Sequence, residues 1–152
     1  AALTPETARW GASWADGLIT VAAPGAPVRE VVDAFRAAGG RNKPVHLQVK
    51  LSYAPREDEA LAGALDQWRT NALPPDTSAT LRSPDAFERA ARGIGETEIR
   101  KAVHIGASLE DHIRCLLDYL ALEVDAMYLH NVNRQQDGFI ETFGRHVLPS
   151  LG

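Results

Sequence analysis

Apolar and polar positions alternate most strictly between Val45 and Tyr53. Valine, leucine and tyrosine take every second position of this segment, and His46, Gln48, Lys50 and Ser52 take the positions between them. Successive side chains of a strand point to opposite faces of a sheet. The pattern therefore predicts a strand over 45–53 with one apolar face and one polar face.

Other segments predict helices and strands in a regular order. Helices are expected where apolar residues recur every three or four positions between recognisable caps, at 5–15, 28–38, 55–71, 108–120 and 134–148. In the helix at 108–120, one apolar stripe is expected to contain Leu109, Ile113, Leu116, Leu117 and Leu120. Short apolar strands are expected between them, at 18–21, 103–105 and 126–132. This alternation is typical of an α/β fold whose parallel sheet is built from βα crossover units.

The polar face of the 45–53 strand separates two kinds of α/β sheet. A central strand of an open sheet, covered by helices on both sides, would be apolar throughout. In a TIM barrel, (β/α)8, the outer face of each strand packs on helices, and the inner face near the catalytic mouth can be polar. A barrel strand is therefore the favoured interpretation, and an exposed edge strand is the alternative.

The segment 72–97 interrupts the regular order. It contains Pro74-Pro75, a patch rich in serine and threonine, and a short helix expected between Ser83 and Gly93. We interpret 72–97 as an insertion between βα units of a single domain, 1–152.

The beginning of the chain is the second irregular feature. Thr4 and Pro5 form a good helix start, with Thr4 as the N-cap and Pro5 at the first helical position. This helix nevertheless follows no strand, and the only methionine is Met127. We therefore expect Ala1-Ala2 to be the remnant of a strand and the chain to be part of a longer barrel.

The composition excludes several classes of protein. The 152 residues are 45% hydrophobic and 24% charged, as in ordinary globular chains, and carry a net charge of −4. This acidity argues against a nucleic-acid-binding protein, and no apolar run approaches the roughly 18 residues of a membrane span. The single cysteine, Cys115, cannot form an internal disulfide and is expected to pack in a helix. We expect a cytoplasmic protein.

Several collinear segments resemble one enzyme superfamily. Residues 1–5 and 15–20 resemble the Ala-Ala-Ser-Gly-Pro and Asp-Gly-Phe/Leu-Ile segments of the bacterial-luciferase-like flavin and deazaflavin oxidoreductases. Residues 49–53 resemble the Ile-Lys-Ile-Ser-Tyr strand of the deazaflavin-dependent glucose-6-phosphate dehydrogenase group in that superfamily. Residues 128–132 and 139–149 resemble the last strand and the last helix of the same group, which also has FMN-using relatives.

The resemblance implies that the chain is the C-terminal half of a TIM barrel with its cofactor at the C-terminal mouth. The implied activity is hydride transfer to or from a small organic substrate, or oxygen-dependent oxidation of the monooxygenase type. The implied cofactor is FMN, with the deazaflavin coenzyme F420 as the alternative. The cofactor contacts carried over by position are Leu3, Thr4, Glu6 and Thr7, although Thr4 replaces the usual glycine and is also a plain N-cap.

The substrate is expected to differ from a sugar phosphate. The phosphate-binding lysine of the dehydrogenase group aligns with Pro24, and its other two cations also fall on non-basic positions. We expect Val21, Lys50 and His130 to line the substrate pocket. Lys50 would contact an anion or else extend to solvent. His130 is a candidate proton-transfer group or else a histidine bonded to a neighbouring loop.

One further turn is a candidate anion site. Gly106, Ala107 and Ser108 join a predicted strand to a predicted helix, where backbone amides can hold phosphate. The alternative is that Ser108 only caps the helix.

Two classes of function stay open at this point. The chain is either part of an oxidoreductase whose catalytic acid/base lies in the N-terminal half of the barrel, or a non-catalytic scaffold that binds no cofactor by itself. In both cases a half-barrel has unpaired strand edges and an exposed inner wall. We therefore expect self-association or pairing with the N-terminal half.

Overall fold

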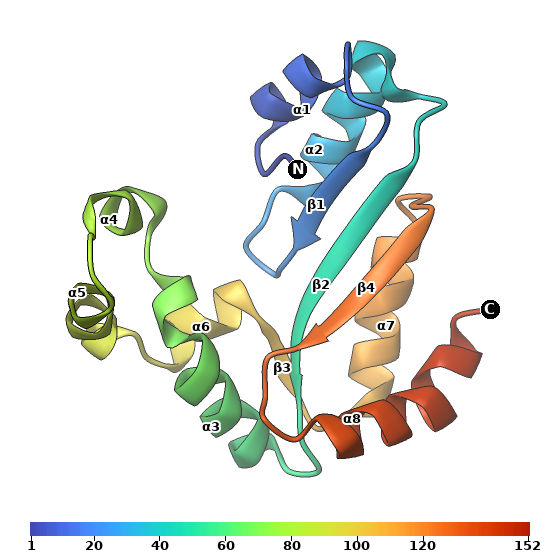
Figure 1. Cartoon of the computed structure of the whole chain (residues 1–152). Helices are drawn as coiled ribbons and strands as arrows, with labels where there is room; N and C mark the ends of the chain where they lie inside the picture. The colour runs from blue at the N-terminus through green and yellow to red at the C-terminus, as the bar shows by residue number, and fades with distance from the viewer.

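The computed structural model describes all 152 residues. It contains a four-stranded parallel sheet with a layer of helices on one face and further helices beside the short third strand (Figure 1). The four strands are β1 (Leu18–Ala22), β2 (Val45–Tyr53), β3 (His104–Gly106) and β4 (Ala126–Asn131), and every strand pair is parallel. This confirms the predicted α/β class and, within one or two residues, the four predicted strands.

Strand β2 lies in the middle of the sheet. Its residues 46–51 pair with β4 along one edge, and its residues 45–49 pair with β1 along the other. The short strand β3 pairs with residues 51–53, beyond the end of β1. Because β2 is paired on both edges, the edge-strand alternative for its polar face is wrong.

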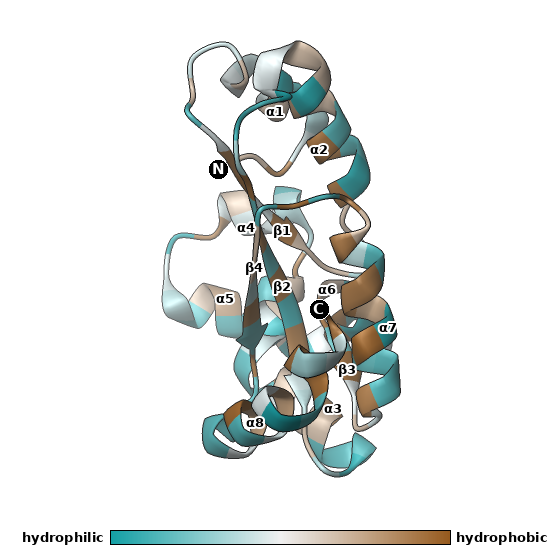
Figure 2. Cartoon of the chain, turned by 90° about the vertical axis from the view of Figure 1, so that its right-hand side faces the viewer, coloured by the Kyte–Doolittle hydropathy of each residue, from teal (hydrophilic) through white to brown (hydrophobic).

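One face of the sheet is covered by helices. Helices α1 (Pro5–Gly11), α2 (Val28–Phe35), α7 (Leu109–Leu120) and α8 (Gln136–Thr142) contribute to this layer, and the edge-on view of Figure 2 shows α2 and α7 along one side of the strands. A cluster of 20 buried residues joins these helices to the apolar face of β1 and β2. The alternation in β2 therefore supplies the core with Val45, Leu47, Val49 and Leu51, which are all buried.

The opposite face of the sheet is open. The strand register places the same-facing residues side by side in three rows: Ile19, His46 and Ala126; Val21, Gln48 and Tyr128; Lys50 and His130. Ile19 and Tyr128 are each 51% exposed. In Figure 1 this open face is turned toward the viewer, with α2 and α7 behind the strands. Of the polar residues of β2, His46, Gln48 and Lys50 therefore lie on this open face, whereas Ser52 is buried and donates a hydrogen bond to the Ala60 carbonyl.

A second, smaller core lies beside β3. It joins α3 (Glu57–Trp68) and α6 (Glu96–Ala102) through seven buried residues, including Ala60 and Ile99. Helices α4 (Pro75–Thr80) and α5 (Pro84–Ala90) extend away from the sheet, at the left of Figure 1. Helix α5 matches the short helix expected there. Helices α4 and α6 were not expected, because six or seven residues are too short to show an apolar period.

The helix starts follow their capping residues. The Thr4 hydroxyl accepts a hydrogen bond from the Thr7 amide at 3.2 Å, and the Ser108 hydroxyl accepts one from the Asp111 amide at 3.2 Å. The ends are less regular: α1 stops at Gly11 rather than near Asp16. In the chain region after α2, Gly39 adopts φ +113°, which only glycine adopts without strain.

One residue of α7 departs from the predicted apolar stripe. Leu117 was expected to face the core with Leu116, but it is 45% exposed. The buried side of α7 is instead formed by His112 and Leu116. In none of the helices is an apolar stretch long enough to cross a lipid bilayer.

Candidate functional site: a lysine and a histidine on the open sheet face

A cavity lies at the C-terminal ends of β1 and β2, on the open face. Its volume is about 730 Å³, within the size range of small-molecule sites. The loop from β1 to α2 forms one wall, and Trp68 of α3 and Lys101 of α6 come from the other side. Lys50 of β2 lies at the cavity between these walls. Barrel enzymes place their active sites at this end of the strands.

Lys50 is held by three neighbours. Its ammonium nitrogen, Nζ, lies 2.8 Å from Nδ1 of His130 and 3.0 Å from Oε1 of Gln48. It also lies over the Trp68 ring, 4.7 Å from the ring centroid. The Trp68 and His130 rings meet edge to face with their centroids 5.0 Å apart. Parallel pairing explains the first contact, because Lys50 and His130 are direct partners in the β2–β4 register.

The protonation of the pair follows from this arrangement. An ammonium group can only donate, so Nδ1 of His130 accepts and the proton of its neutral ring is on Nε2. Burial, and then the charge of Lys50, lower the pKa of His130 below its ordinary value near 6.5. Burial lowers the pKa of Lys50 as well. At neutral pH the site therefore combines a charged ammonium with a neutral imidazole.

The structure brings four of the seven predicted site residues together. Leu3, Val21 and Lys50 line the same cavity, and His130 contacts Lys50. The other three, Thr4, Glu6 and Thr7, do not line it. The Thr4 hydroxyl is engaged with Thr7 Oγ1 at 3.0 Å and with the Thr7 amide, so its observed role is helix capping.

Thr7 faces a different hollow. It lines a small cavity of about 90 Å³ together with Trp10 and Trp14, whose ring centroids are 5.0 Å apart. Glu6 is exposed in the first turn of α1. The candidate cofactor contacts thus divide into Leu3, on the cavity wall, and three residues around the start of α1.

The Gly106–Ser108 turn already holds an anionic group from the chain itself. The Ala107 amide donates to Oε2 of Glu57 at 3.0 Å, and Oε1 of Glu57 accepts from Arg100 at 2.8 Å. Arg100 also donates to the Ile105 carbonyl. An internal carboxylate therefore occupies the amide that a phosphate would use, and Ser108 caps α7.

Sequence reasoning missed Trp68 as a site residue. It shares the helical spacing of Leu61 and Leu65, which is the spacing of a core stripe, so nothing in the pattern separated it from packing residues. The fold reveals its role because α3 begins right after β2 and its last turn lies near Lys50.

Comparison with known proteins finds one curated relative and solved structures of the same fold. No protein-family model matches the chain. A curated relative, an F420-dependent glucose-6-phosphate dehydrogenase of Microbacterium testaceum (strain StLB037), is 23% identical over 105 residues, which are 69% of this chain and 31% of that protein.

Two solved structures match almost the whole chain. An F420-dependent secondary alcohol dehydrogenase, in complex with an F420-acetone adduct, matches 97% of this chain and 46% of its own with a TM-score of 0.76 at 20% identity. The coenzyme F420-dependent tetrahydromethanopterin reductase of Methanopyrus kandleri matches 99% of this chain and 50% of its own with a TM-score of 0.64 at 16% identity. The chain therefore shares the fold of these two enzymes over about half of their length.

Proposed function

We propose that the chain is the C-terminal half of a deazaflavin-dependent oxidoreductase and forms one wall of its active site. The observation that carries the proposal is the cavity with Lys50 and His130 at the C-terminal strand ends, in a chain whose fold matches half of an F420-dependent alcohol dehydrogenase. Coenzyme F420 is the preferred cofactor because the three similar proteins described above are each named as F420-dependent.

The residues on the open face suit this role. The cavity is lined by 20 residues, 11 of them hydrophobic, which is the apolar lining that a planar ring system requires. When bound, a deazaflavin supplies a hydride acceptor and donor. This chain would contribute Leu3 and the start of α1 to the cofactor side, and Val21, Lys50 and His130 to a small organic substrate. Residues 72–97 would be an insertion between two βα units.

We propose also that a second half-barrel covers the open face. Large exposed apolar side chains lie on the β1 side of the molecule, at Leu3, Trp10, Trp14 and Ile19, and on the β4 and α8 side, at Tyr128, Ile140 and Leu148. The outer edge of β4 carries backbone groups that no strand pairs with. The complementary half of the barrel would bury these apolar side chains and pair with the free edge of β4. For the isolated chain, a second copy of itself would take that place.

Equilibrium titration with coenzyme F420 tests the proposed cofactor. We expect saturable binding, followed by the fluorescence of the deazaflavin, and weaker binding of FMN. Leu3→Asp is expected to weaken binding about tenfold, because it places a negative charge on the cavity wall near an anionic cofactor. Leu117→Asp, at an exposed leucine of α7 that does not line the cavity, is expected to leave binding unchanged.

The other outcomes of this titration are equally informative. Tighter binding of FMN than of F420 would indicate that the cofactor of this fold half is a flavin rather than a deazaflavin. If neither cofactor binds at millimolar concentration, the chain is the non-catalytic scaffold that the sequence left open.

A further inference from the structure

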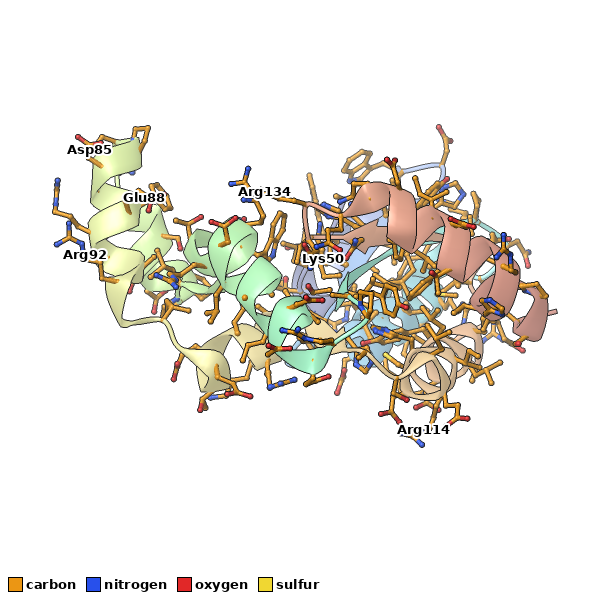
Figure 3. The ribbon with its side chains drawn as sticks, turned by 90° about the horizontal axis from the view of Figure 1, so that it is seen from below. Lys50, Asp85, Glu88, Arg92, Arg114 and Arg134 are labelled. Carbon is orange, nitrogen blue, oxygen red and sulfur yellow. The ribbon has the colours of Figure 1, made fainter.

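The cavity lining holds an ammonium group without a counter-ion. None of the eight ion pairs of the molecule includes Lys50, and its two hydrogen-bond partners, Gln48 and His130, are uncharged. In Figure 3, Lys50 lies near the middle of the view, between α3 and α8. Two other labelled cations, Arg92 after α5 and Arg114 of α7, lie at the periphery.

The surrounding charges leave the cavity positive. The charged residues of its lining are Lys50, Lys101 and Glu98. Glu98 accepts a hydrogen bond from the Gly95 amide at 3.0 Å, as part of the capping box of α6. A partly buried cation is ordinarily paired with an anion, because the free energy lost when the charge leaves water exceeds the free energy gained from hydrogen bonds to uncharged groups. An anionic ligand in the cavity could therefore supply the counter-charge of Lys50.

The geometry of Lys50 also limits the kind of anion. Two of its three ammonium protons are directed to Gln48 and His130, which leaves one for a ligand. One charge-assisted hydrogen bond suits a monoanion such as a carboxylate. A phosphate dianion would need further cations or amides, and Lys101 of α6 is the only other cation of the lining.

We propose that Lys50 binds the carboxylate of a small-molecule substrate in this cavity, with Gln48, His130 and Trp68 as positioning residues. The proposal rests on the proposed function only in taking the cavity as the substrate pocket. Carboxylate binding itself requires no cofactor, so it can be measured without F420. Failure of cofactor binding and failure of carboxylate binding are then separate results.

Trp68 provides the measurement because its ring lies against Lys50. In a Trp10→Phe/Trp14→Phe background, Trp68 is the only remaining tryptophan of the three. Its fluorescence is followed during titration with sodium butyrate, with sodium chloride at equal ionic strength as the reference. We expect a saturable change with butyrate, weakened about tenfold or more in Lys50→Met. Lys43→Met, at a lysine that does not line this cavity, is the matched control and is expected to bind within about twofold of the background protein.

Three results would overturn the proposal. The first is a Trp68 signal that butyrate changes no more than sodium chloride does. The second is equal weakening by Lys50→Met and Lys43→Met, which would indicate general electrostatic attraction. The third is tighter binding of inorganic phosphate than of butyrate. Circular dichroism of each variant confirms that the comparison is made between folded proteins.

Discussion

Phe143→Ala is expected to lower the free energy of unfolding by about 3–5 kcal/mol. Phe143 is 2% exposed, and its ring packs against Tyr53, His112 and Phe139 with centroid distances of 5.4, 5.3 and 4.4 Å. The substitution leaves a cavity between β2, α7 and the end of α8. A loss of this size is a large part of the roughly 5–15 kcal/mol by which domains are stable.

Ile140→Ala is the matched control for this prediction. Ile140 lies three residues earlier in α8 and is 65% exposed, so its truncation is expected to change the free energy of unfolding by less than about 0.5 kcal/mol. Urea unfolding followed by circular dichroism measures both variants. Equal losses in the two would contradict the assignment of the core to this side of α8.

The second large effect is expected from acid, through His112. Its imidazole is fully buried, and Nε2 lies 3.0 Å from the Gly106 carbonyl, so the neutral ring donates from Nε2. Burial lowers the pKa of His112 to about 4. The His104 ring, with its centroid 4.7 Å away, adds to this lowering, while Asp111 and Glu57 oppose it.

The direction of the pH dependence follows from these values. In the unfolded chain His112 titrates near 6.5, so between pH 6.5 and 4 the unfolded state binds a proton that the folded state does not. Stability is therefore fully present above pH 6.5 and falls as the pH decreases toward 4. The total loss through this residue is roughly 3 kcal/mol.

Urea unfolding at pH 7.5, 5.5 and 4.5 measures this loss. The wild-type chain is expected to lose stability more steeply than His112→Asn, which has no titrating group. His146→Gln, at an exposed histidine, is expected to follow the wild type. The same pH dependence in all three proteins would show that His112 contributes nothing to it.

The sequence predicted the framework of the sheet because alternation and caps are local signals. The 45–53 pattern identified β2 and both of its faces, and Thr4 and Ser108 marked two helix starts correctly. Leu117 was expected to face the core but is exposed, because apolar spacing does not distinguish the centre of a helix stripe from its margin. Helices α4 and α6 were missed because they are shorter than two full periods of an apolar stripe.

The site was predicted in part for a related reason. Lys50 and His130 stood out because a titratable residue on the polar face of a strand, or at the C-terminal end of one, is visible in the sequence. Their contact depends on the β2–β4 register, which pairs residues 80 positions apart and which no local signal specifies. The same holds for Glu57, whose carboxylate occupies the Gly106–Ser108 turn from 50 positions away. Long-range pairing therefore set the limit of the sequence analysis.

The open face of the sheet is the feature that a complete barrel would explain. A strand face with a lysine, a histidine and exposed apolar residues is costly in a chain that stands alone, but in the proposed barrel it would be the inner wall. We therefore propose that the face containing Ile19, Lys50 and Tyr128 is covered by another half-barrel.

Sedimentation equilibrium of the isolated chain tests this claim most directly, with Ile19→Lys on the open face and Leu117→Lys on the outer side of α7 as a matched pair. We predict that the wild type and Leu117→Lys associate reversibly above the 16.5 kDa of one chain, and that Ile19→Lys sediments as a monomer. A wild-type chain that stays monomeric at millimolar concentration, or equal behaviour of the two variants, would contradict the claim.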